Sequence, residues 1–181
     1  MKQISRLIAW GIIPLLAFIL ALQNNILNNN YSDLRLTPVY SVVYIIFGFI
    51  MAMYFFFVLY YLIKKENLAI FYRSLLWISL AVFLSGIILP YHPQGNDVSS
   101  LRHVDFVLLA MALYIVTLIK YLASNKMILL RKQRFIMVFL IGAGMILLFS
   151  QKVNSLLELW GAIGMSVLLE YLYEKEKNFD I

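Results

Sequence analysis

Six long runs of apolar residues divide this chain of 181 residues, and they constrain its fold more than any other feature. Each run is continuous and about as long as a helix that crosses the roughly 30 Å of hydrocarbon in a bilayer. Strands of a membrane barrel would instead alternate apolar and polar residues. We therefore predict an all-α, polytopic integral membrane protein with six transmembrane helices. The predicted spans are Leu7–Leu22, Pro38–Ile63, Ile70–Leu89, Val104–Ala123, Phe135–Ser150 and Leu156–Tyr173.

The composition agrees with this interpretation and limits the function. The chain is 63% hydrophobic and 13% charged, whereas a soluble domain carries about 25% charged residues. Six spans of about 20 residues leave only tails and loops, so we expect residues 1–181 to form a single transmembrane bundle without a soluble catalytic or nucleotide-binding domain. The chain has no cysteine, which excludes disulfides, thiolate catalysis and cysteine metal sites.

The positions of the 15 lysines and arginines predict the orientation of the bundle. Only Arg35, Arg102 and Lys152 lie in gaps that would face outward. Because cytoplasmic loops carry the excess of basic residues, we predict a plasma-membrane protein with both termini in the cytoplasm. The net charge of +6 then reflects topology, and we expect no nucleic-acid partner. The twelve residues on the other side are Lys2, Arg6, Lys64, Lys65, Arg73, Lys120, Lys126, Arg131, Lys132, Arg134, Lys175 and Lys177.

Polar residues gather at the predicted outer ends of the helices, where they indicate a ligand-binding pocket. Glu158 is the most informative of them, because helical spacing places it on one stripe with Gly161 and Ala162. Small residues mark the face of a membrane helix that packs against other helices. An ionisable group on that face needs a partner, which Arg35, Arg102, Lys152 or a protonated His103 could supply. The candidate pocket residues are Asp33, Arg35, Arg102, His103, Asp105 and Glu158.

Metal binding and glycosylation are weaker hypotheses. His92 and His103 are the two histidines and have Asp97 and Asp105 nearby, but their spacing follows no metal motif. His103 and Asp105 are two residues apart on a helix and therefore face different directions. We predict no cofactor, and a metal site at His92 and His103 is only a subordinate alternative. Asn30 begins an Asn-Tyr-Ser sequence, formally a glycosylation acceptor.

Glu170 lies near the predicted inner end of the sixth span. We expect it at the headgroup level beside Lys175, as a snorkelling or paired charge. The sequence shows no phosphate loop, no nucleophile elbow and no serine–histidine pair of the rhomboid type.

Several short motifs follow one another along the chain. They are Tyr31-Ser32-Asp33-Leu34-Arg35-Leu36-Thr37-Pro38, Arg73, Leu89-Pro90, Leu101-Arg102-His103 and Leu157-Glu158-Leu159-Trp160. Together they resemble the FRAG/DRAM/Sfk superfamily of six-span membrane proteins and its bacterial relatives. The resemblance implies a bundle with an outward-facing polar pocket under the first and third outer loops. Members are linked to lipid remodelling, lipid asymmetry and membrane stress, and the resemblance would place Asp33, His103 and Glu158 at the pocket.

Three functions remain open from the sequence. The first is a non-catalytic or accessory protein whose outward-facing pocket engages a lipid headgroup or a partner membrane protein. The second is the small membrane subunit of a transporter. The third is a lipid-modifying hydrolase or acyltransferase that uses His103 with Asp105 or Glu158, because acid–base catalysis needs such groups within hydrogen-bonding reach of the reacting atom.

Overall fold

The computed structural model describes residues 2–92, 98–124, 126–150 and 153–178. Throughout these residues the regular elements are helices and no strand occurs, which confirms the predicted all-α class. Five helices are long and apolar enough to cross a membrane: Gln3–Leu22, Pro38–Lys65, Ile70–Ile88, Val98–Ser124 and Ser155–Glu174. The fifth predicted span falls on a further helix, whose apolar part, Ile136–Ser150, is shorter than these five.

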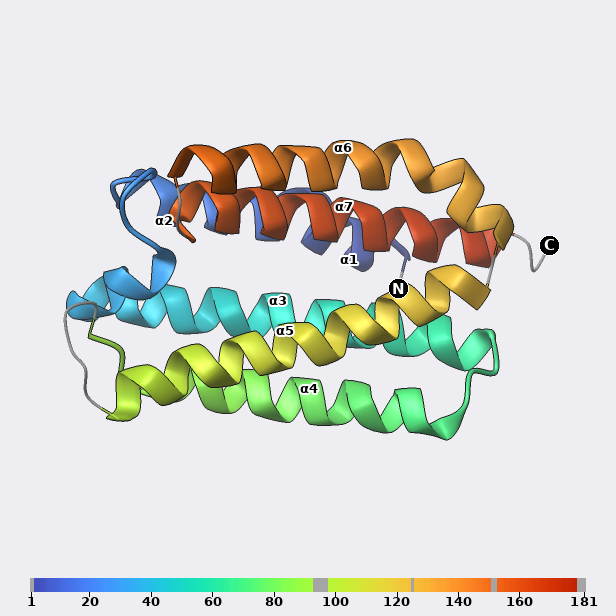
Figure 1. The fold of residues 1–181 in the computed structure, drawn as a ribbon, viewed down its shortest axis with the longest axis horizontal. Coiled ribbons are helices and arrows are strands. Elements are labelled where there is room, and N and C mark those ends of the chain that lie inside the picture. Colours follow the sequence, from blue (N-terminus) through green and yellow to red (C-terminus); the bar gives the residue numbers. More distant parts are fainter. Residues whose placement is uncertain (1, 93–97, 125, 151–152, 179–181) are drawn as a thin grey trace.

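The helices form two layers (Figure 1). The first helix, α7 and α6 make one layer, while α3, α4 and α5 make the other, and α3 packs on α7 between them. We call the end with segment 23–37 the loop end, and the end with the start of α1 and the close of α7 the terminal end. The elements are α1 (Lys2–Leu7), η1 (Ile8–Ile12), α2 (Ile13–Leu22), η2 (Tyr31–Leu36), α3 (Pro38–Lys65), α4 (Ile70–Ile88), α5 (Val98–Ser124), α6 (Lys126–Ser150) and α7 (Ser155–Asn178).

Proline and charge set the bounds of α3 and α4. Pro38 occupies the first position of α3, where its fixed φ suits a helix and its missing N–H costs nothing. The helix closes at Lys64 and Lys65, whose charges interact favourably with the carbonyl end of the helix dipole. Leu89, which precedes Pro90, has extended backbone angles and ends α4, because a proline disfavours the helical conformation of the residue before it.

The first helix contains one turn of π-helix, η1, between α1 and α2. There the Ile13 N–H donates to the Ile8 carbonyl, one residue farther back than in an α-helix. The next residue, Pro14, has no N–H to donate. The buried Ala9 carbonyl instead accepts a hydrogen bond from Ser166 Oγ of α7 at 3.2 Å. This contact fastens the first helix to α7.

Glycines bring α6 and α7 close together. A Cβ on Gly142 would lie 2.5 Å from the Trp160 ring, and a Cβ on Gly164 would collide with the Phe139 ring. The Trp160 and Phe139 rings stack, and Trp160 Nε1 donates to the Phe139 carbonyl at 3.0 Å. Small residues allow such close packing in membrane helices, where helix association depends on van der Waals contact.

Two helices begin six or more residues earlier than predicted, and the first helix, expected from Leu7, begins at Lys2. The fourth span was expected from Val104, but α5 begins at Val98. The fifth was expected from Phe135, but α6 begins at Lys126. Polar and basic residues occupy both extensions, so hydropathy marked the apolar part of each helix and missed its polar first turns. His103 consequently lies inside α5 rather than before it.

Candidate functional site

Segment 23–37 lies at the loop end, and its hydrogen bonds fix the position of η2. Asn30 caps η2 reciprocally with Asp33: the Asn30 N–H donates to Asp33 Oδ2 at 2.9 Å, and the Asp33 N–H donates to Asn30 Oδ1 at 3.1 Å. Asn24 Nδ2 donates to the Asn30 carbonyl at 2.5 Å and to Ser155 Oγ at 3.1 Å. The Asn30 amide, the formal glycosylation acceptor, therefore takes part in the capping box. One oxygen of Asp33 serves the same cap.

Glu158 joins η2 to α7. Its Oε2 atom accepts a hydrogen bond from the Tyr31 backbone N–H at 2.5 Å. The buried Tyr31 hydroxyl donates to the Ala17 carbonyl at 2.7 Å. Burial, followed by the nearby Glu158 charge, raises the pKa of the Tyr31 hydroxyl well above its ordinary 10.0, so Tyr31 stays a neutral donor. Tyr31 thus connects η2 to the first helix and to α7.

The partner of Glu158 differs from the sequence-based expectation. We expected Arg35, Arg102, Lys152 or a protonated His103. Within the described part of the chain none of these forms an ion pair with Glu158, and Lys152 lies outside it. Its partner is instead the Tyr31 main-chain N–H, which donates to Glu158 in the first turn of α7.

Ser32 and His103 form a buried polar chain that sequence reasoning missed. His103 Nδ1 lies 2.8 Å from the Gly86 carbonyl and Nε2 lies 3.0 Å from Ser32 Oγ. Because a carbonyl only accepts, Nδ1 donates, and Nε2 of the neutral ring accepts from the serine hydroxyl. The Tyr44 hydroxyl lies 3.2 Å from Ser32 Oγ. A serine–histidine pair is therefore present, although the sequence indicated none.

The close approach of α4 and α5 makes this pair possible. A Cβ on Gly86 would lie 3.2 Å from Phe106 Cβ and from a Val107 methyl group. Since Gly86 has no side chain, α5 comes close enough for His103 to reach its carbonyl. Ser32 and His103 are 7% and 3% exposed, and the Tyr91 ring lies 5.0 Å from the His103 ring. Hydrogen bonds therefore orient the Ser32–His103 pair, and its burial shields it from solvent.

Arg35 caps a helix end in this structure. Its guanidinium donates to the Leu89 carbonyl and, at 3.1 Å, to the Ile88 carbonyl. These carbonyls close α4, where a cation interacts favourably with the helix dipole. The guanidinium also lies 6.0 Å from the centre of the Tyr44 ring, within the range of a cation–π contact.

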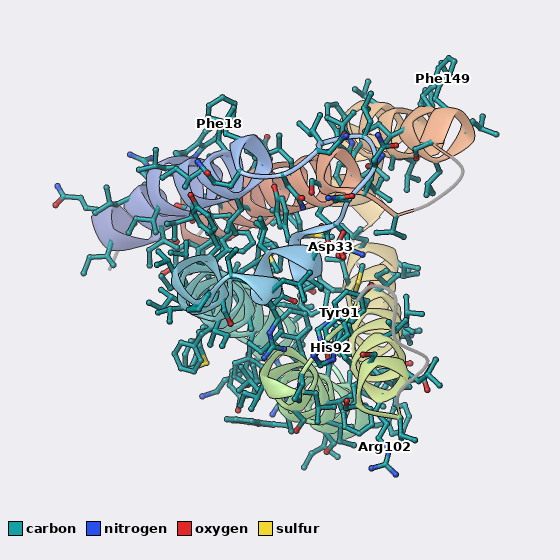
Figure 2. The ribbon with its side chains drawn as sticks, turned by 90° about the vertical axis from the view of Figure 1, so that its left-hand side faces the viewer. Phe18, Asp33, Tyr91, His92, Arg102 and Phe149 are labelled. Atoms are coloured by element: carbon teal, nitrogen blue, oxygen red, sulfur yellow. The ribbon has the colours of Figure 1, made fainter. Side chains whose placement is uncertain are left out.

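The remaining candidate residues do not join this cluster. Arg102 and Asp105 are exposed on α5, and Figure 2 shows Arg102 pointing away from the bundle, whereas Asp33, Tyr91 and His92 lie near its centre. No group of three metal-ligating side chains occurs within the described residues, and Asp97 lies outside them. Asp105 and His103 point in different directions, as their spacing predicted.

A surface cleft of about 460 Å³ opens at the loop end between segment 23–37, α6 and α7. Its apolar wall includes Met145, Ile146 and Phe149 of α6, and Asn28 and Asn154 are among its polar lining residues. Asn154 is fully buried and its amide is engaged, since Nδ2 donates to the Leu27 carbonyl at 3.1 Å and Oδ1 accepts from the Leu157 N–H at 3.0 Å. Asn28 is exposed and lines the cleft. The cleft therefore combines an apolar wall with hydrogen-bonding groups at the end of the helices.

Glu170 is buried among the helices. We expected a headgroup-level charge beside Lys175; the Glu170 side chain is 1% exposed, and the Lys175 side chain lies outside those that the structure describes. Its Oε2 accepts from the hydroxyls of Ser5 and, at 3.0 Å, Tyr54. The exposed ion pair of that region is formed four residues later, between Glu174 and Arg6.

Comparisons with protein-family models, curated proteins and solved structures found no match for this chain. The resemblance to the FRAG/DRAM/Sfk superfamily therefore stays a prediction.

Proposed function

We propose that this protein is a six-span protein of the plasma membrane whose loop end faces outward and engages the headgroup of a membrane lipid. In this proposal α6 crosses the membrane in addition to the five long apolar helices, and both termini are cytoplasmic. The charge distribution supports the orientation, because the segments at the loop end hold three of the 15 basic residues.

The absence of cysteine allows a direct test of orientation. Asn25 is exposed at the loop end and Ala69 is exposed in the turn between α3 and α4. In intact cells, a membrane-impermeant maleimide should label Asn25→Cys, and it should label Ala69→Cys only after permeabilisation. Labelling in the opposite order would reject the proposed orientation.

The cleft beside α6 is the observation that carries the lipid proposal. A lipid offers an apolar chain and a polar headgroup, and the cleft offers an apolar wall together with the Asn28 amide. Phe149 and Met145 of that wall are 83% and 48% exposed, so the wall continues onto the surface that faces the bilayer. The headgroup would lie at Asn28, with one acyl chain along α6.

Native mass spectrometry of the gently solubilised protein tests this proposal. Met145→Trp fills the cleft and should remove lipid that the wild type retains. Leu148→Trp is the matched control, because Leu148 is 75% exposed on the same helix and does not line the cleft. Equal lipid retention in both variants would contradict the proposal, and a partner protein retained in place of lipid would favour the alternative occupant.

One observation favours a second candidate, a hydrolase or acyltransferase that acts on esters. Ser32 Oγ would attack the ester carbonyl carbon while His103 Nε2 takes the hydroxyl proton. The carbon–oxygen bond to the leaving alcohol then breaks, and that alcohol receives the proton from Nε2. Water or a second alcohol would release the acyl group from Ser32. The 3.0 Å contact between Ser32 and His103 supports this candidate, and Tyr91 would have to move to admit the ester.

A fluorophosphonate probe distinguishes the two candidates. An esterase should be labelled in the wild type and in Ser85→Ala, a control on α4, but not in Ser32→Ala. His103→Gln should label at least 100-fold more slowly, since general-base catalysis contributes about 10²–10⁴-fold. An unlabelled wild-type protein that retains lipid would exclude the esterase and leave the non-catalytic lipid-binding proposal as the one that remains.

A further inference from the structure

The most unusual buried group lies at the terminal end, away from the lipid cleft. Glu170 is 1% exposed and lies within a helix that is apolar enough to span the membrane. It is four residues, or roughly 6 Å along the helix, inside the Glu174–Arg6 ion pair. A charged group at such a depth is costly unless another group compensates it.

The two carboxylate oxygens of Glu170 differ in their surroundings. Oε2 accepts hydrogen bonds from Ser5 Oγ of α1 and Tyr54 Oη of α3. Oε1 is also buried, but it has no hydrogen-bond partner in the part of the chain that the structure describes. A buried polar atom without a partner costs about 1–3 kcal/mol, and more when it is charged.

The cations whose side chains the structure describes form no ion pair with this carboxylate. Arg6 is the nearby arginine, and its guanidinium pairs with Glu174. Among the described residues, no lysine, arginine or histidine forms an ion pair with Glu170. The two hydroxyl partners are neutral donors, so they orient the carboxylate without neutralising it.

We propose that Glu170 binds a small monovalent metal cation at Oε1, between α1, α3 and α7. The free Oε1 atom would be the ligand, while the Ser5 and Tyr54 hydroxyls hold the carboxylate through Oε2. Hard cations prefer such oxygen ligands. One carboxylate balances a single positive charge, whereas a divalent ion would leave excess charge inside the membrane. The described residues contain no group of three acidic or histidine ligands that would hold a divalent ion.

A cation at this position would connect the start of the chain to the rest of the bundle. Ser5 belongs to the first helix, Tyr54 to the other layer and Glu170 to α7. The ion would therefore stabilise the docking of residues 2–12. This inference is independent of the lipid proposal, because it depends on the opposite end of the molecule.

The test compares thermal unfolding of the full chain in Na⁺ and in choline at equal ionic strength, with K⁺ as a further arm. Wild type should gain about 5–10 °C in Tm when Na⁺ or K⁺ is roughly 100-fold above its Kd. Glu170→Gln, which keeps the shape and one acceptor oxygen, should show no gain. Glu174→Gln is the matched control on the next turn and should keep it.

Tyr54→Phe provides a second variant if Glu170→Gln does not fold. It removes one hydroxyl that orients the carboxylate, and it should raise the cation concentration at half-maximal stabilisation by about 10-fold, as loss of one site-orienting partner does. Hydrogen exchange of residues 2–12 should slow in Na⁺ relative to choline. Equal Tm in both salts, a gain that persists in Glu170→Gln, or stabilisation by protons alone would each overturn the proposal.

Discussion

Replacing Glu158 tests whether the loop end is held by a single carboxylate. Glu158→Ala leaves the Tyr31 N–H, which now donates at 2.5 Å, without its acceptor. A hydrogen bond to a charged group contributes about 1.5–3 kcal/mol, and a carboxylate in the first turn of a helix adds about 0.3–1 kcal/mol. The free energy of unfolding should fall by about 2–4 kcal/mol. Glu158→Gln keeps an acceptor oxygen and should lose about half as much.

Thermal unfolding of the purified protein measures this loss. For a chain of this size, 1 kcal/mol corresponds to a Tm change of about 2–4 °C, so a loss of about 2–4 kcal/mol should lower the Tm of Glu158→Ala by about 4–16 °C. Glu174→Gln serves as a control on the same helix, because an exposed ion pair contributes about 0–1 kcal/mol. If Glu158→Ala and Glu174→Gln had the same Tm, the inferred role of the Tyr31–Glu158 contact would be wrong.

Three further changes probe other contacts. Ser166→Ala leaves the buried Ala9 carbonyl without its partner on α7, and thermal unfolding should show a loss of about 1–3 kcal/mol. Gly164→Val drives a side chain into the Phe139 ring; a loss of about 1–3 kcal/mol should accompany a changed tryptophan emission spectrum, and an unchanged spectrum would argue against close α6–α7 packing. His103→Ala removes the link between η2 and α4, so limited proteolysis should cut segment 23–37 faster than in wild type.

The apolar runs predicted the helices well where a strong local signal marks each end. The second span was predicted as Pro38–Ile63 and observed as Pro38–Lys65, because a proline and two lysines mark its bounds. The predictions for α5 and α6 began six and nine residues late, at Val104 instead of Val98 and at Phe135 instead of Lys126. Hydropathy measures affinity for the bilayer, whereas a helix can continue through polar residues at its ends.

The candidate site was less accessible to sequence reasoning. Glu158 was expected to face other helices, and it does contact Tyr31, but through the main chain. Every residue except proline has a main-chain N–H, so residue types do not reveal which one donates. Ser32 and His103 are 71 residues apart in sequence, so only the packing of η2 and α5 on the same helix, α3, brings them together. Glu170 likewise contacts Ser5, which is 165 residues away in sequence.

The π-turn at Ile8–Ile12 determines the rotational phase of the start of the chain. One extra residue in a helical turn rotates everything before it by about 100° relative to a continuous α-helix. With that rotation, Ser5 faces Glu170 and Arg6 faces Glu174. Deleting one residue from the π-turn would restore the α-helical phase and turn both side chains away from α7, while leaving α2 in place. The orientation of the six residues of α1, Lys2–Leu7, relative to α7 thus depends on a single inserted residue.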